Sequence, residues 1–288
     1  MEEHTSTSPG ILKAGDNVLF VDEKNREYLR ILLPETIIAL RGGNIPAEQF
    51  IGLPDGSLVE VGKTERFRVL RPTYARLIPN LPRKAQVIYP KDVGPMLLWG
   101  DVYPGAKVLE IGSGPGALTL ALLRALGAEG CLVTVEIRRD HCEMARGNVR
   151  RFMGTVPNWM LAQADAYVGL PIQTADRVFV DLPEPWRVLA NVRKTLRVGG
   201  VLVCYIPTVL QVKSLVDALT DDTRFDNVEV MENMLRFWHV KDLSVRPEHR
   251  MVAHTGFIII ARRVMDGSAV RVKTQKELNA LQNDESMS

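Results

Sequence analysis

Apolar and polar residues alternate in short runs over the first quarter of the chain. The runs cover residues 17–21, 27–33, 58–61 and 66–70, and turn formers stand between them. Alternation with a period of two is typical of half-buried strands, and no helical period lies between these runs. Residues 1–70 are therefore predicted to form a small all-β domain, either a compact barrel or a sandwich.

Prolines interrupt the segment that follows, residues 71–91. They are Pro72, Pro79, Pro82 and Pro90. Because proline lacks a backbone donor and clashes with the preceding helical turn, this segment cannot hold a long helix. It is predicted to be a connector between two domains.

From residue 92 to residue 265, strand-like apolar runs alternate with helical periods. Strands are predicted at 108–111, 132–136, 160–164, 177–181 and 201–207, and helices at 117–126, 140–152, 188–196 and 209–219. This alternation predicts an α/β fold, a Rossmann-like parallel sheet covered by helices on both faces. Two further strands, at 228–231 and 256–261, lack a helical crossover and are expected to form an antiparallel edge. Residues 266–288 are polar and aperiodic, which is typical of a loose tail.

The segment Val108–Gly116 reads V-L-E-I-G-S-G-P-G and ends in a glycine-rich loop. Gly112, Gly114 and Gly116 let the backbone approach a ligand closely, since a Cβ there would stand in the way. A helix N-terminus follows, which completes a nucleotide-type cofactor site. Gly112, Gly114 and Ala117 also fit the dinucleotide fingerprint, so the glycines alone leave an NAD-dependent oxidoreductase open.

Acidic residues at the ends of the predicted strands narrow the choice of cofactor. Glu110 would repel a pyrophosphate but can hold an ammonium or sulfonium group, and S-adenosylmethionine carries both. Glu136 ends the next strand, where a carboxylate can accept both ribose hydroxyls, although both cofactor families use that position. Asp165 follows a third strand and can accept the adenine amino group. Asp181 ends a central strand and is expected to point into the crevice where open α/β sheets bind ligands.

Composition adds few constraints. The 288 residues suffice for a catalytic domain plus a smaller one, and a net charge of +2 does not by itself indicate a nucleic-acid partner. The three cysteines lack metal or disulfide spacing and are interpreted as core residues in a reducing compartment. No apolar leader or membrane-length run is evident, so a cytoplasmic location without membrane contact is expected. His249 and His254 lack partners at ligand spacing, so they are interpreted as hydrogen-bonded structural residues and no metal is expected.

Basic residues gather in the connector and near the C-terminus, where they are candidates for phosphate contacts. These residues are Arg71, Arg76, Arg83, Lys84, Lys91, Arg246, Arg250, Arg262 and Arg263. A third group, around the predicted helix 140–152, is ambiguous, because a charged helix face is usually only solvated.

Several motifs together resemble the tRNA (adenine-N1)-methyltransferases, which modify adenine 58 of the T-loop. They are the loop G-S-G-P-G-A-L-T, I-Y-P-K-D before the catalytic domain, D-L-P-E-P-W, the strand ending in Y-I-P, and R-P-E-H-R-M-V-A-H-T-G-F. The last three motifs are far more specific than the glycine loop. The resemblance runs from about residue 15 to residue 263 and includes the small β-domain.

This resemblance implies a class I methyltransferase fold, S-adenosylmethionine as methyl donor, tRNA as substrate and a homotetramer. By position, Asp181 should lie between cofactor and target base as the catalytic residue, and Tyr89 and Tyr205 match family aromatics around that base. Taken with the reasoning above, the predicted cofactor-binding residues are Glu110, Gly112, Ser113, Gly114, Pro115, Gly116, Ala117, Leu118, Glu136, His141, Asp165 and Asp181.

The chemistry of adenine N1 suits these residue types. N1 already carries an in-plane lone pair, so methyl transfer needs alignment more than a strong base. Asp181 can accept a hydrogen bond from the N6 amino group and stabilise the positive charge that develops. Because N1 lies on the pairing edge, the nucleotide must be extruded, and Tyr89 or Tyr205 can stack on it. For either tyrosine, a buried core ring is an equally good interpretation.

Other functions stay open on the sequence alone. A methyltransferase of the same fold could act on a protein or a small molecule, which would leave the β-domain and the arginines without an obvious use. A non-catalytic tRNA-binding subunit is a further alternative. Against it count the intact residues Gly112, Gly114, Gly116, Glu136 and Asp181. No residue settles whether the adjacent position 57 is also modified.

Overall fold

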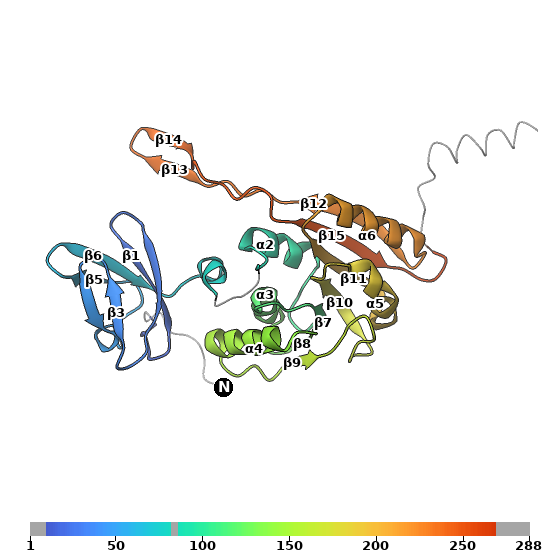
Figure 1. Cartoon of the computed structure of the whole chain (residues 1–288), viewed down its shortest axis with the longest axis horizontal. Coiled ribbons are helices and arrows are strands. Elements are labelled where there is room, and N and C mark those ends of the chain that lie inside the picture. Colours follow the sequence, from blue (N-terminus) through green and yellow to red (C-terminus); the bar gives the residue numbers. More distant parts are fainter. Residues whose placement is uncertain (1–9, 82–85, 269–288) are drawn as a thin grey trace, which may run out of the picture.

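The computed structural model describes residues 10–81 and 86–268. Its N-terminal part is a four-stranded antiparallel sheet in the order β2-β1-β6-β5, accompanied by a two-stranded hairpin (Figure 1). The strands of the sheet are β1 (Asn17–Asp22), β2 (Glu27–Ile31), β5 (Ser57–Val61) and β6 (Glu65–Leu70). The predicted strands are therefore present in an all-β unit.

One core holds this N-terminal unit together. Phe20 and Phe50 pack edge to face with ring centroids 4.9 Å apart, and Phe67 and Leu12 are buried in the same cluster. The hairpin β3 (Ile37–Leu40) and β4 (Gly43–Pro46) covers this core through the buried Ile38. The sequence pattern gave no sign of this hairpin, because each of its strands has only four residues.

The described part of the connector before residue 82 forms two short helical pieces, in line with its prolines. These are α1 (Tyr74–Leu77) and the 3-10 turn η2 (Ile78–Asn80), while Pro82, Arg83 and Lys84 lie outside the described residues. A longer helix, α2 (Pro90–Trp99), already starts inside the predicted connector. Pro90 begins it because the first helical turn needs no backbone donor there.

The second unit is a seven-stranded sheet in the order β12-β15-β11-β10-β7-β8-β9. The five adjacent strands β11, β10, β7, β8 and β9 pair in parallel. Strand β15 is antiparallel to both β11 and β12, so the predicted antiparallel edge is confirmed. The strands are β7 (Lys107–Ile111), β8 (Cys131–Glu136), β9 (Trp159–Gln163), β10 (Ala175–Val180), β11 (Leu196–Ile206), β12 (Phe225–Glu232) and β15 (Phe257–Arg263).

Helices cover both faces of this sheet, which confirms the Rossmann-like layering. One apolar cluster joins α2, α3 and α4 to the first face, and another joins α5 and α6 to the second. The four helices after α2 are α3 (Ala117–Leu126), α4 (Arg139–Met153), α5 (Leu189–Thr195) and α6 (Val209–Asp221). No helix among the described residues is long and apolar enough to cross a membrane.

Between β12 and β15 the chain leaves the sheet and forms a projecting hairpin, which we call the arm (residues 233–255). Its strands are β13 (Trp238–Lys241) and β14 (Ser244–Pro247), and Figure 1 shows it extending past α2 toward the side of the N-terminal unit. Large apolar side chains on the arm are exposed, among them Phe237 at 63% and Leu243 at 100%. Strand assignment from the sequence left this segment open.

Candidate active site

The glycine loop joins β7 to α3 and is fixed by contacts with other segments. A Cβ on Gly112 would lie 2.3 Å from the carbonyl oxygen of Asp181, and one on Gly116 would lie 3.1 Å from Cα of Ala145 in α4. Both glycines also have positive φ, which non-glycine residues rarely adopt. Of the three loop glycines, Gly114 alone has nothing within 4 Å of its ideal Cβ. Two of the three glycines thus also permit close contacts within the protein, and the approach of a ligand to this loop stays a prediction.

Glu136, at the end of β8, holds this loop in place. Its carboxylate accepts hydrogen bonds from the backbone N–H groups of Ser113 and Gly114, both at 3.2 Å, and from that of Arg138 at 2.9 Å. A carboxylate can accept about four hydrogen bonds, so capacity remains for a ligand. Glu136 also lines a hollow, described next, and its contact with ribose hydroxyls stays a prediction.

A hollow of about 260 Å³ lies at the carboxyl ends of β7, β8 and β9. Asp165 lines it together with Glu136, and its Oδ1 accepts a hydrogen bond from the Tyr167 N–H at 2.9 Å. The Tyr167 ring forms another wall, and the Arg187 guanidinium lies 4.4 Å from its centroid. The sequence analysis did not single out Tyr167. Its position two residues after the strand-end acid Asp165 could have suggested that its ring lies at the same site.

Two buried polar atoms near the loop have no hydrogen-bond partner within the described part of the chain. They are Nε2 of His141 and Oε1 of Glu110. Nδ1 of His141 lies 3.5 Å from the Glu136 carboxylate. Such orphaned atoms fit a ligand that brings its own polar groups, as S-adenosylmethionine would, because buried polar groups are normally paired.

Glu110 lies below the loop and has no accessible surface. Its Oε2 accepts hydrogen bonds from the hydroxyls of Thr119 and Thr134, both at 2.8 Å. Burial raises the pKa of Glu110 to about 8, despite these two bonds and with help from the charges of Asp181 and Glu136. The raised pKa favours the neutral acid, which would weaken the expected repulsion of a pyrophosphate. Its contact with a cationic group stays a prediction.

Asp181 follows β10, and its N–H donates to the carbonyl of Ile111 at 2.8 Å. The residue is exposed as a whole, and its backbone carbonyl lies against Gly112. Surrounding protein atoms, with the charge of Glu136, raise the pKa of Asp181 to about 7.

The two tyrosines occupy different surroundings. In the parallel pair β10 and β11, Val180 lies opposite Cys204. The residues that follow them, Asp181 and Tyr205, therefore lie side by side at the same sheet edge. Tyr205 is only 8% exposed, and its hydroxyl donates to Asp92 at 3.3 Å. Tyr89 lines a mainly apolar groove of about 1000 Å³ between the connector, α2 and the arm. A hydrogen-bonded buried ring therefore describes Tyr205, while Tyr89 faces an open groove.

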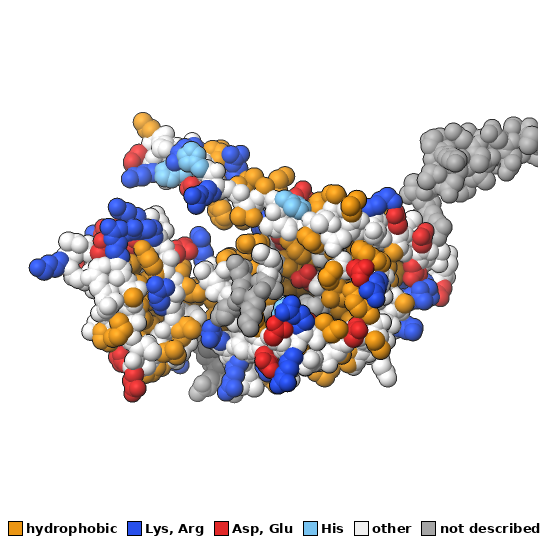
Figure 2. Space-filling model, in the orientation of Figure 1, with side chains coloured by type: hydrophobic (Ala, Val, Ile, Leu, Met, Phe, Trp, Pro, Cys, Tyr) orange, Lys and Arg blue, Asp and Glu red, His pale blue; other side chains and the backbone are white. Residues whose placement is uncertain are grey.

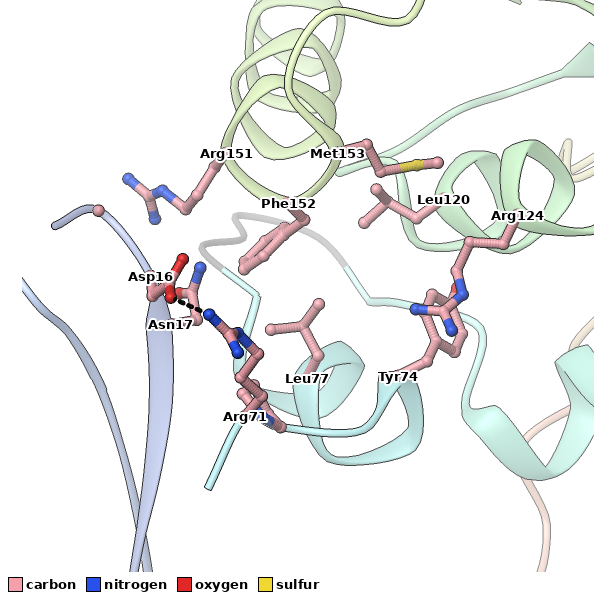
Figure 3. Close-up of a pocket in the computed structure, with 12 residues that line it drawn as sticks. Asp16, Asn17, Arg71, Tyr74, Leu77, Leu120, Arg124, Arg151, Phe152 and Met153 are labelled. Atoms are coloured by element: carbon pink, nitrogen blue, oxygen red, sulfur yellow. Dashed lines mark hydrogen bonds and ion pairs between the residues drawn. The ribbon is translucent and has the colours of Figure 1, made fainter. Parts of the chain in front are cut away.

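Basic side chains are distributed over several parts of the molecule, and Figure 2 shows many of them over the N-terminal strands and the arm. A hollow of about 660 Å³ lies at the seam of the two units. Figure 3 shows Arg71, Arg124 and Arg151, which line it from three different segments. Arg71 is paired there with Asp16 at 2.7 Å. Arg124 and Arg151 leave a net positive charge around this hollow.

Three of the expected phosphate contacts have other surroundings. Lys91 is buried and forms an ion pair with Asp92 at 2.8 Å. Arg262 pairs with Val201 in the sheet register, which puts it at the sheet edge opposite Asp181. Arg263 lies next to it, and its side chain is 11% exposed. Lys91 is therefore held within the protein, whereas phosphate contacts of Arg262 and Arg263 stay predictions.

His254 is hydrogen-bonded on both ring nitrogens, as expected. Nδ1 lies 2.7 Å from Oε1 of Glu232, and Nε2 lies 2.9 Å from the carbonyl oxygen of Pro207. Because both partners are acceptors, the ring is best satisfied as an imidazolium, and the Glu232 hydrogen bond raises the pKa of His254. No cluster of three or more His, Cys, Asp or Glu suited to a metal occurs in residues 10–81 and 86–268.

Comparison with known families links this geometry to methyl transfer. Residues 67–255 match the family described as tRNA methyltransferase complex GCD14 subunit, and residues 10–59 match a TrmI-like N-terminal family. The chain is 33% identical to tRNA (adenine(58)-N(1))-methyltransferase TrmI of Thermus thermophilus over 252 residues, 85% of this chain and 96% of the relative. It is 27% identical to tRNA (adenine(57)-N(1)/adenine(58)-N(1))-methyltransferase TrmI of Methanocaldococcus jannaschii over 270 residues, 85% of this chain and 94% of the relative.

Solved structures give the same fold. A SAM-dependent O-methyltransferase of Thermotoga maritima superposes with a TM-score of 0.84 at 28% identity, covering 91% of this chain and 97% of the other. The tRNA (m1A58) methyltransferase TrmI of Aquifex aeolicus superposes with a TM-score of 0.77 at 29% identity, covering 89% and 100%. Both are methyltransferases, which favours a methyl-donor site at the glycine loop over the dinucleotide site of an oxidoreductase.

Proposed function

The chain belongs to the family described as tRNA methyltransferase complex GCD14 subunit, and from this membership we propose that it transfers a methyl group to N1 of adenine 58 in tRNA. The single observation that carries the proposal is the position of Asp181, an acid at the carboxyl end of β10 that lies beside Gly112 of the glycine loop and next to Tyr205 in the strand register. The 33% identical relative is named for the same reaction.

S-adenosylmethionine, the proposed donor, supplies a methyl group on a sulfonium, which is a good leaving group. Glu136, Asp165 and Tyr167 line the hollow that suits its adenosine part, and the orphaned His141 Nε2 supports a polar ligand nearby. The described residues therefore fit this cofactor. Ser113, Pro115, Ala117 and Leu118 belong to the same loop and helix start, and their contacts with it are proposed from position.

Asp181 orients the target base in this mechanism. Its carboxylate accepts a hydrogen bond from the N6 amino group, which turns N1 toward the methyl group. As the bond to N1 forms, the adenine becomes positively charged, and an ionised carboxylate beside it lowers the energy of that state. A hydrogen bond to a charged group contributes about 1.5–3 kcal/mol, which corresponds to roughly 10- to 150-fold in rate.

The basic hollow at the seam and the basic residues of the arm are proposed to contact tRNA phosphates. Exposed apolar residues on the arm need a partner surface, and we propose that other copies of the chain provide it in a homotetramer. All three cysteines are free thiols, which suits the reducing cytoplasm proposed as its location.

The direct test is methylation of an unmodified tRNA transcript with a labelled methyl donor, followed by nucleoside analysis. The expected product is 1-methyladenosine at position 58, and a transcript with guanosine at 58 reports any modification at 57. Asp181→Asn should lower the rate by tens- to hundreds-fold, whereas Asp217→Asn, a surface acid on α6, should leave it unchanged. A wild-type protein that binds S-adenosylhomocysteine yet leaves tRNA unmodified would contradict the proposal and favour another methyl acceptor, as in the Thermotoga enzyme.

A further inference from the structure

A fully buried carboxylate, Asp92, joins three of the sequence motifs outside the cofactor hollow. It lies in the first turn of α2, within the motif I-Y-P-K-D. Its Oδ2 accepts hydrogen bonds from the Thr255 hydroxyl at 2.6 Å and from the Tyr205 hydroxyl at 3.3 Å. Its Oδ1 accepts one from Nζ of Lys91 at 2.8 Å. Tyr205 belongs to the strand ending in Y-I-P and Thr255 to the motif H-T-G-F, so these motifs converge on one side chain.

Both ends of the Tyr205 side chain are fixed by this arrangement. A Cβ on Gly256 would lie 2.5 Å from Cζ of Tyr205, so the ring rests directly on the backbone next to Thr255. Asp92 holds the hydroxyl, and the strand register holds the Cα beside Asp181. Burial, with smaller effects from Asp92 and Asp181, raises the pKa of Tyr205. The hydroxyl is therefore already engaged by Asp92, and the buried ring serves as a fixed wall next to Asp181.

The same turn of α2 also fastens the arm. Pro95 lacks an N–H, so the carbonyl of Lys91 has no helical donor, and the side-chain amide of Asn233 donates to it instead. Nζ of Lys91 donates in return to the carbonyl of Asn233 at 2.6 Å. Asn233 begins the arm and Thr255 ends it, so both legs of the arm are tied to the first turn of α2.

We propose that Asp92 is a positioning residue for the methyl-transfer step: it holds Tyr205 against Asp181 and holds the α2 turn that follows Tyr89. The proposal rests on the proposed function, since it assumes that the crevice beside Asp181 receives a base. A buried carboxylate costs free energy unless hydrogen bonds satisfy it, and removing it releases Lys91, Tyr205 and Thr255 at once. Small displacements of orienting groups reduce alignment and hence the rate of transfer.

The kinetic test compares Asp92→Asn, Tyr205→Phe and the double variant in the tRNA methylation assay. Asp92→Asn is expected to lower kcat by about tenfold to a hundredfold, with the KM for S-adenosylmethionine unchanged. The double variant should be no slower than Asp92→Asn, because both changes remove the same link. The matched control is Asp22→Asn, a buried carboxylate of the N-terminal unit with several donors, which should change stability but not kcat.

Full kcat in folded Asp92→Asn, or effects of Asp92→Asn and Tyr205→Phe that simply add, would overturn the proposal. If Asp92→Asn does not fold, Thr255→Val removes one hydrogen-bond donor to Asp92 and is expected to lower kcat by a smaller factor. A crystal structure of Asp92→Ala tests the positioning role of Asp92 without an activity assay. A displaced Tyr205 ring supports the proposal, and an unmoved ring refutes it. Wild-type protein that does not methylate tRNA rejects the proposed function instead and leaves this crystallographic result to decide the role of Asp92.

Discussion

Gly112 and Gly114 stand two residues apart in one loop, yet the structure predicts different consequences when each becomes alanine. A Cβ at Gly112 would enter the carbonyl of Asp181 at 2.3 Å, and neither backbone segment can yield without moving its strand. A Cβ at Gly114 meets nothing within 4 Å and would project into open space at the loop. Gly112→Ala should therefore damage the fold and Gly114→Ala the ligand site.

The cost of Gly112→Ala has two parts. Its φ of +87° costs a non-glycine residue roughly 1–2 kcal/mol, and forcing extra atoms into a packed site typically costs about 1–3 kcal/mol. The sum of about 2–5 kcal/mol corresponds to a fall in Tm on the order of 10 °C for a protein of this size. Gly114→Ala has only the backbone part, so it should lose about 1–2 kcal/mol.

Urea unfolding followed by circular dichroism measures these differences, and calorimetric titration with S-adenosylhomocysteine measures affinity. Gly154→Ala supplies the matched control, since that glycine has a φ of +73°, open space around it and a place at the end of α4. We expect Gly112→Ala to be clearly less stable than this control, and Gly114→Ala to match the control in stability while binding the ligand more weakly. Equal stability of the Gly112 and Gly154 variants would refute the reasoning.

Four other outcomes can be measured. The methylation rate should rise with pH through about 7 and then level off, because Asp181 must be ionised, and Asp181→Asn should show a flat profile. Glu110→Gln should raise Tm above pH 8, where the buried wild-type acid is forced to ionise, and have little effect near pH 4.5; equal Tm gains at both pH values would contradict this. His254→Gln should lose stability below pH 6.5, and the deficit should vanish as pH rises through the raised pKa of His254; a constant deficit would argue against an imidazolium. Leu243→Asp should lower the molar mass measured by light scattering, whereas Leu33→Asp in the N-terminal unit should not.

Local sequence signals predicted the regular elements of the larger unit. The helix expected at 117–126 is α3 with the same bounds, because an apolar helical period stands between Gly116 and Gly127. The antiparallel edge followed from the missing crossover before the last strand. The elements that were missed carry weak or misleading signals. Pro90 indicated a break where it begins α2, and β13 and β14 are short strands with exposed apolar residues.

The sequence named candidate site residues, and their contacts with ligands stay predictions. Acids at strand ends follow from chain order, so Glu136, Asp165 and Asp181 could be named from the sequence. Contacts between distant segments could not, because no local pattern records them. The hydrogen bond between Tyr205 and Asp92 spans 113 residues, and the approach of Gly112 to Asp181 depends on the sheet register. The burial of Glu110 likewise depends on Thr119 and Thr134, which only the folded sheet brings around it.

The insertion of β15 between β11 and β12 has a consequence for how the molecule is made. The last strand of the chain pairs with β11, whose final residue precedes the start of β15 by about fifty positions. During synthesis, β11 and β12 leave the ribosome before β15, the strand that pairs with both of them. The sheet is completed only when residues 257–263 arrive, so chains that stop short of them would expose the free edge of β11 and an unpaired β12 to aggregation.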